Sequence, residues 1–314
     1  MSEDTVEPGE VTGESARIYG TGYRSWERSF QPDSKRFLFL TWEEIKLIAR
    51  PRWPLYVFVS LRLIFFIFEM LAVLNGPPPG DLPFNQYYFM RLSSTGSPML
   101  GLTDVLLVFY AGSSVLSRDR LSGAYSLYFS RPLTRLEYLA VKFSAVAFYV
   151  LSFTWLPAIY TYLALGSAYD FKPIDYFKWE YFQNLLAVMG YGLLIIFLLT
   201  SFVLLLSSYL RKGWYIGVIL VALPIVSSIV YSILVQLEVQ NSAIYVGPFA
   251  SSVYVLAWLL GIDKTFLVEQ MGRFDATFIT SVAYVGSMGA YIMMALFVVL
   301  LGLLFVRIRS LEVI

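Results

Sequence analysis

Six apolar segments, each long enough to cross a bilayer, constrain the fold of this chain more than any other feature. They cover residues 54–74, 99–117, 136–165, 185–208, 214–235 and 282–306. A helix needs about 20 apolar residues to cross roughly 30 Å of hydrocarbon, whereas a lone strand would leave backbone groups unpaired in lipid. Only 14% of the 314 residues are charged. The sequence therefore predicts an all-α polytopic membrane protein with six transmembrane helices.

The basic residues predict how these helices are oriented. If the N-terminus is cytoplasmic, the inner segments hold 17 of the 23 Lys and Arg residues, the outer segments hold five, and Arg62 lies inside the first span. Lys and Arg collect on the cytoplasmic side of membrane proteins. We therefore expect a multi-pass protein of the cell membrane, plasma or inner, with both termini cytoplasmic. Residues 1–36 would form a cytoplasmic tail and residues 310–314 a cytoplasmic C-terminus, around a transmembrane domain at 54–309.

Residues 37–53, just before the first span, are predicted to form an amphipathic interfacial helix. Thr41 and Glu44 have capping-box spacing, apolar residues recur on one face, and Pro51 and Pro54 end the pattern. The alternative is that this stretch is the cytoplasmic start of the first span.

Two outer segments are predicted to lie at the membrane surface. Residues 173–184 place apolar and aromatic residues on one helical face behind Pro173. Residues 246–280 begin with the apolar run 246–262, in which a helix from Pro248 would cover only about 22 Å. We expect interfacial or re-entrant helices here, and a seventh span at 246–262 is the alternative.

The loop between the second and third spans combines charges with apolar residues. It reads LSRDRLSGAYSLYFSRPLTRLEYLAVKFSA. Asp119 is placed to cap a helix, Pro132 to end it, and Thr134 with Glu137 to form a capping box at the start of the third span. The pattern predicts a short cytoplasmic helix over residues 119–131. Its apolar face either lies in the membrane interface or docks into a soluble partner.

This loop resembles that of the ABC-2 type permeases, the membrane subunits of ABC exporters. The matching positions are Asp119, Arg120, Ser122, Gly123, Leu127, Pro132, Thr134, Arg135, Glu137 and Lys142. Leu121, often acidic in the family, and Ala124, often Thr, depart from its pattern. The interfacial helix, the six spans and the outer helices are also family-like, so the resemblance covers about residues 37–309.

The resemblance implies an ABC-2, type V exporter-like permease fold and a non-catalytic subunit. Two copies of such a permease form the translocation pathway in membrane lipid, and a coupling helix in each copy inserts into one of two ABC ATP-binding subunits. The chain has no G-x-x-x-x-G-K-[ST] phosphate loop. ATP and Mg²⁺ are therefore expected in the partner ATPase, with no cofactor in this chain and no nucleic-acid partner. The residues expected to serve ATPase coupling are Asp119, Arg120, Leu121, Tyr125, Tyr128, Arg131, Arg135 and Glu137.

Three charged residues fall inside the predicted spans. Arg62 and Glu69 are two helical turns apart in the first span, and Asp104 lies in the second. Because an ionisable group is costly in hydrocarbon, these side chains should face protein or water. They either line a pathway for a cationic or amphipathic substrate or serve helix packing and capping.

Other functions remain open at this level. The outer segment 236–281 is compatible with a membrane anchor or force-transmitting ABC subunit that acts on an extracytoplasmic partner. A secondary transporter or channel is a further alternative, although no internal repeat is evident. A membrane enzyme is disfavoured, because the chain has no His, no Cys and no clustered carboxylates. The sequence does not identify a substrate.

Overall fold

The computed structural model describes most of the chain. The described residues are 33–50, 82–95, 102–113, 115–121, 134–210, 212–269, 277 and 279–310, with ten scattered positions between 53 and 71. These residues are mostly helical and include no strand. Four of their helices are long and apolar enough to cross a membrane, namely α7 (Arg135–Ala168), α8 (Trp179–Tyr209), α9 (Gly213–Gln236) and α13 (Val282–Ser310). Four such helices are what a helical membrane protein requires, and they confirm the predicted third to sixth apolar segments as long helices.

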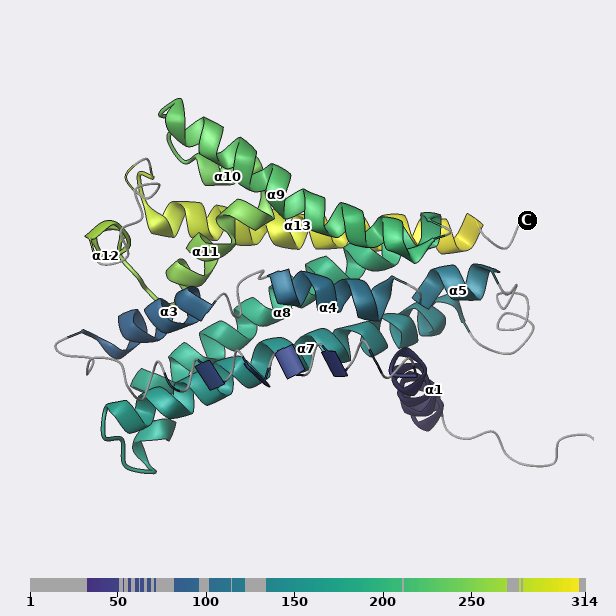
Figure 1. Cartoon of the computed structure of the whole chain (residues 1–314), viewed down its shortest axis with the longest axis horizontal. Coiled ribbons are helices and arrows are strands. Elements are labelled where there is room, and N and C mark those ends of the chain that lie inside the picture. The colour runs from purple at the N-terminus through teal and green to yellow at the C-terminus, as the bar shows by residue number, and fades with distance from the viewer. Residues whose placement is uncertain are drawn as a thin grey trace, which may run out of the picture.

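The long helices lie side by side, and the shorter helices gather towards the two ends of the bundle (Figure 1). One end, called here the α1 end, contains α1 (Asp33–Ile48), α5 (Val115–Leu121), the start of α7 and the end of α13. The opposite end, called the α3 end, contains α3 (Phe84–Thr95), α10 (Ser242–Val246) and α12 (Lys264–Glu269). The end of α5, the start of α7 and the end of α13, which flank predicted inner segments, thus lie at one end of the bundle.

The predicted second span, residues 99–117, is not one continuous helix. Its residues form α4 (Leu102–Gly112), a break, and then α5. The Ser207 hydroxyl on α8 accepts the backbone N–H of Leu116 at 3.2 Å and of Ser117 at 3.1 Å, and it donates to the Ser113 carbonyl oxygen at 3.2 Å. The first N–H groups of a helix have no partner within it. A side chain from another helix therefore caps α5. Its hydrogen bonds satisfy backbone groups at the break that would otherwise be buried without partners.

The helix α1 differs from the predicted range 37–53 at both of its ends. It begins at Asp33, so the last residues of the predicted tail 1–36 are helical, and it ends at Ile48, before Pro51. Thr41 therefore lies inside the helix and does not cap it. Residues 1–32 and 311–314 lie outside the described part of the chain.

The predicted first span, residues 54–74, lies mostly outside the described residues. The ten described positions between 53 and 71 are helical and exposed. The number of spans beyond the four long helices stays a prediction.

The α3 end is packed with aromatic side chains from segments far apart in the sequence. The sequence pattern did not predict α3, which buries Tyr87, Tyr88, Phe89 and Leu92. The Tyr88 hydroxyl donates to a carbonyl of α7 (Ala158 O, 2.8 Å). The Phe84 ring contacts the rings of Tyr88, Tyr162, Tyr169, Phe171 and Tyr181 at centroid distances of 5.4 to 5.8 Å. Ring contacts thus fix α3 against α7 and α8.

The predicted outer helix at residues 173–184 is wrong as a separate element. A single 3-10 turn, η1 (Asp175–Phe177), precedes α8, and extended backbone at Lys178 (φ −63°, ψ 133°) separates the two. The Asp175 carboxylate is paired with Lys178 Nζ at 2.7 Å and accepts the Lys172 N–H at 2.8 Å, and these contacts hold its pKa below the usual range. These local contacts favour a turn over a continuous helix.

The outer segment 246–280 contains short helices. The apolar helix α11 (Pro248–Leu259) begins at the expected proline and has 12 residues, about 18 Å at 1.5 Å per residue. It is too short to cross a bilayer, which disfavours the seventh span. It packs along α13, and a Cβ at Gly286 would meet Trp258 and the Tyr254 carbonyl oxygen. Residues 270–276 and 278 lie outside the described part.

Candidate functional site

Charged side chains from three helices form a buried network at the α1 end. Lys142 of α7 places its Nζ 2.8 Å from Glu44 Oε2 on α1 and 2.7 Å from Asp119 Oδ2 on α5. Arg118 Nη2 lies 3.0 Å from Glu44 Oε1, and the Tyr138 hydroxyl donates to Asp119 Oδ2 at 2.8 Å. These five residues are called the charge network below. It joins α1, α5 and α7.

The charge network is buried and its formal charges balance. The side chains of Lys142, Glu44 and Asp119 are only 2%, 7% and 6% exposed, and that of Arg118 is 36% exposed. Two carboxylates face two cations. Removing charges from water costs several kcal/mol per ion unless each one is paired. The three helices are therefore held in an arrangement in which all four charges have partners.

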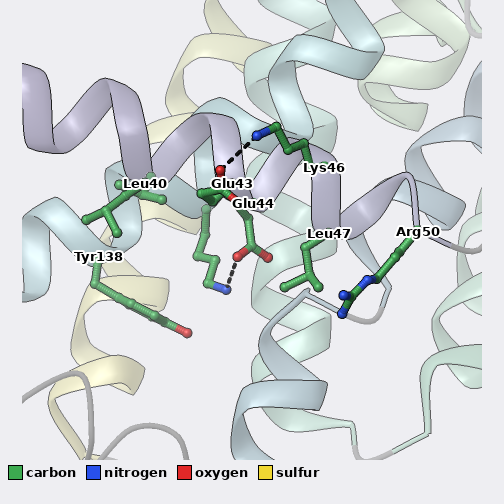
Figure 2. A pocket seen from close by; sticks show the side chains of 9 residues that line it. Leu40, Glu43, Glu44, Lys46, Leu47, Arg50 and Tyr138 are labelled. Carbon is green, nitrogen blue, oxygen red and sulfur yellow. Dashed lines mark hydrogen bonds and ion pairs between the residues drawn. The ribbon is translucent and has the colours of Figure 1, made fainter.

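Two neighbouring acids on α1 have different roles. Glu43 pairs with Lys46 at 2.8 Å on the exposed face of the helix, whereas Glu44 turns towards α7 (Figure 2). The predicted capping role of Glu44 is wrong, because α1 begins eight residues before Thr41.

The charge network forms part of the wall of a pocket with a volume of about 440 Å³. The pocket is lined by Leu40, Glu43, Glu44, Lys46, Leu47, Arg50, Tyr138, Val141 and Lys142.

Hydrogen bonds outside the charge network also hold α1 against the bundle. The Tyr149 hydroxyl of α7 donates to the Ile45 carbonyl oxygen at 2.7 Å, and the Tyr110 hydroxyl of α4 donates to that of Ile48 at 2.9 Å. Ile48 is the last residue of α1, where carbonyl groups need partners from outside the helix, and Tyr110 supplies one. These contacts make α1 an integral part of the bundle end.

Two of the residues predicted to serve ATPase coupling lie at the α1 end. Asp119 belongs to the charge network, and Glu137 lies at the start of α7 beside it. Asp119 lies in the last turn of α5 and does not cap a helix that begins after it, so its predicted capping role is wrong. Its carboxylate instead binds Lys142 and Tyr138. Glu137 forms the predicted capping box with Thr134, which is confirmed, and it also pairs with Arg36 of α1 at 2.8 Å.

The other predicted coupling residues are described less fully. Arg135 is the first residue of α7 and is half-buried. Arg120 and Leu121 belong to the end of α5, but the described part does not include their side chains. Tyr125, Tyr128 and Arg131, and with them most of the predicted helix 119–131, lie outside the described residues. The docking role of these residues stays a prediction.

The side chains of the three charged residues predicted inside the membrane lie outside the described part of the chain. Asp104 lies in the first turn of α4, and its side chain is outside the described part. Arg62 and Glu69 are outside it altogether. A pathway role for these three residues stays a prediction.

The pairing of Glu44 with Lys142 was not predicted, although the sequence contains a signal for it. Lys142 follows Tyr138 by four residues on the buried stripe of α7, which continues through Ala145 and Tyr149. Glu44 precedes the buried Ile48 by four residues on α1. A charged residue on a buried helical stripe requires a partner. Two such residues of opposite sign on neighbouring elements indicate a pair, although not its geometry.

The geometry of the α1 end defines a helical bundle in which buried ion pairs hold α1 against α5 and α7. Compared with known proteins, the chain matches no family model, no curated protein and no solved structure. Its residues and their arrangement are therefore the basis for the function proposed next.

Proposed function

We propose that this chain is the membrane-spanning permease subunit of an ATP-driven ABC exporter of the ABC-2 type. It would form the translocation pathway as a dimer in the cell membrane, with its N-terminus in the cytoplasm. Two copies of a separate ATP-binding subunit would bind ATP and Mg²⁺ and hydrolyse the nucleotide. The observation that carries this proposal is the charge network, which anchors both ends of the loop at residues 122–133.

The loop leaves α5 at Leu121 and enters α7 at Arg135. Asp119 stands just before the loop and Tyr138 and Lys142 just after it, so their contacts close the loop at its base. Glu44 ties the same base to α1. Contacts that join α1, α5 and α7 at the base of the loop would let a displacement received there pass into the bundle as a rigid-body movement.

Two sequence features support the same function. The loop carries the order of residues that resembles the coupling segment of ABC-2 permeases, from Asp119 to Lys142. The basic residues at the two ends of the loop favour the cytoplasmic side of the membrane, where ATP is available. An apolar helix on that side would have a reason to dock into a soluble ATPase.

Purification of the tagged full chain from its native membranes, with mass spectrometry of co-eluting proteins, tests the proposal. The wild-type chain is expected to retain an ABC-type ATPase. Leu121→Asp and Tyr128→Asp are expected to reduce its recovery at least about tenfold, since a charge placed in a packed interface costs more than 1.4 kcal/mol.

Phe177→Asp is the matched control, because Phe177 is an exposed aromatic residue in the turn η1, whose neighbour Tyr176 belongs to the aromatic cluster around Phe84 of α3. It should leave ATPase recovery unchanged. The proposal is wrong if the wild-type chain retains no ABC-type ATPase. The docking face is wrongly assigned if both loop variants retain as much as the control.

A further inference from the structure

A second pocket lies at the α3 end, away from the charge network. It has a volume of about 710 Å³ and is formed by the start of α3, the end of α7, the first turns of α8 and the end of α11. Small-molecule sites usually have volumes of about 300 to 1,000 Å³. Asn85, Tyr169, Glu180, Tyr181, Asn184 and Trp258 supply most of its polar and aromatic lining.

The charge of this pocket is negative. Glu180, exposed in the first turn of α8, is the one charged side chain that lines it among the residues described here. No described cation lies within ion-pairing distance of its carboxylate. The nearby Lys178 pairs directly with Asp175 at 2.7 Å, and Glu180 acts on it only through a weaker attraction across space. A carboxylate in a cleft without a cation in direct contact attracts a cationic ligand.

Aromatic rings line the same pocket. Trp258, which is 36% exposed, comes from α11, whereas Tyr169 and Tyr181 come from α7's end and α8. Tyr181 is held in place by the Phe171 ring at a centroid distance of 4.3 Å. The faces of Trp and Tyr rings carry negative potential and bind substituted ammonium groups. The rings and the carboxylate therefore favour the same kind of ligand.

Side-chain amides complete the lining and are fixed by the backbone. Asn85 Nδ2 donates to the Leu260 carbonyl oxygen at 2.9 Å, which joins α3 to the end of α11. Asn184 Nδ2 donates to the Glu180 carbonyl oxygen at 3.1 Å. An amide that donates through its nitrogen still has an oxygen that accepts hydrogen bonds. A ligand with a hydroxyl or N–H group would find an acceptor at Asn184.

We propose that this pocket binds a small organic cation that has a substituted ammonium group and at least one hydrogen-bond donor. Glu180 supplies the charge, Trp258 and Tyr181 contact the ammonium group, and Asn184 accepts from the donor. The site is at the opposite end of the bundle from the charge network, so it does not depend on ATPase coupling.

Calorimetric titration of the full chain with choline tests the site. The chain is held in nanodiscs of phosphatidylglycerol, a lipid without an ammonium group. Its neutral comparison ligand is 3,3-dimethyl-1-butanol, in which carbon replaces the nitrogen of choline. Choline is expected to bind saturably, and the neutral compound to bind at least about tenfold more weakly, because it lacks the charge that the carboxylate and rings recognise.

Variants assign this binding to the pocket. Glu180→Gln and Trp258→Leu are expected to weaken choline binding at least about tenfold. Glu180→Asp should retain most of it, because the charge remains. Glu238→Gln is the matched control, since Glu238 is an exposed acid that does not line the pocket. Thermal unfolding of each variant in the same nanodiscs shows whether a loss of binding is a loss of folding.

Three results would overturn the proposal: that choline does not bind, that the neutral compound binds as tightly as choline, or that the folded Glu180→Gln variant binds choline with unchanged affinity. Titration with maltose covers the main competing class, a neutral saccharide. Saturable maltose binding that does not depend on Glu180, without choline binding, would identify a saccharide site instead.

Discussion

At the residue scale, the Lys142 side chain links three helices at the α1 end. It is 2% exposed and contacts carboxylates from two other helices. Lys142→Met would leave Glu44 and Asp119 buried without their shared partner. We expect the free energy of unfolding in detergent to fall by roughly 3–5 kcal/mol, as for other broken buried pairs.

Neutralising the two acids should reverse much of this loss. The triple variant with Lys142→Met, Glu44→Gln and Asp119→Asn leaves no buried carboxylate unpaired, so it should be more stable than the single variant. Lys178→Met, which removes an exposed cation at the α3 end, should unfold like the wild type. A single Lys142→Met variant as stable as the wild type would show that the network does not hold the helices.

Two glycines offer a second prediction at this scale. A Cβ at Gly286 would lie 2.5 Å from the Tyr254 carbonyl oxygen and would also collide with Trp258, whereas a Cβ at Gly190 has no atom within 4 Å. Gly286→Ala should therefore separate α11 from α13 and lower the melting temperature. Gly190→Ala should be neutral or raise it, because alanine is favoured over glycine inside a helix by about 1 kcal/mol. Equal melting temperatures for both variants would contradict the close packing of α11 on α13.

Individual side-chain contacts were predictable from the sequence only where they are local. The capping box of Thr134 and Glu137 spans three residues, so its spacing alone predicted it correctly. The pair of Glu44 and Lys142 joins residues far apart in the chain, and no local pattern specifies such a contact. The same limitation explains why Asp119 was assigned to a cap, since its partners Tyr138 and Lys142 follow the loop.

At the element scale, the cap of α5 is the feature most open to test. Ser207→Ala removes the acceptor for the Leu116 and Ser117 N–H groups. We expect a loss of about 1 kcal/mol, as for other lost caps, and faster hydrogen exchange over residues 115–121. Ser228→Ala is the control, because the Ser228 hydroxyl bonds only the Pro224 carbonyl in its own helix. Unchanged exchange in Ser207→Ala would show that α5 does not depend on this cap.

Apolar length predicted whole helices well and their interruptions badly. The segments at 136–165, 185–208, 214–235 and 282–306 each correspond to one long helix. The segment at 99–117 has the same apolar character, but it breaks where Ser207 supplies hydrogen bonds from another helix. Hydropathy measures only how apolar the side chains of a segment are. It takes no account of hydrogen bonds that a side chain from another helix supplies to the backbone. The turn at 172–178 was mispredicted because its ion pair competes with helical periodicity.

At the scale of the whole molecule, the lack of cysteine permits a direct test of orientation. Single-cysteine variants Lys212→Cys, Lys178→Cys and Glu238→Cys introduce one reactive thiol each, because the chain has no Cys of its own. Lys212 precedes α9, and Glu238 follows it. A membrane-impermeant maleimide applied to intact cells should label positions 178 and 238, and position 212 only after permeabilisation.

This pattern follows if α8 and α9 each cross the bilayer with the α1 end in the cytoplasm. Labelling of 212 and 238 from the same side would contradict a crossing by α9. Labelling of position 212 alone in intact cells would show that the orientation is opposite to the one that the basic residues predict.

The charge network also imposes an order on biogenesis. Glu44 and Asp119 are synthesised before Lys142, so the first two segments leave the ribosome with acids whose shared counter-ion does not yet exist. The emergence of α7 from the ribosome supplies it and allows α1 and α5 to pack against the new helix. Nascent chains that stop before residue 142 should therefore present an unlocked α1 to quality-control proteases, whereas chains long enough for all of α7 to have emerged should already protect it.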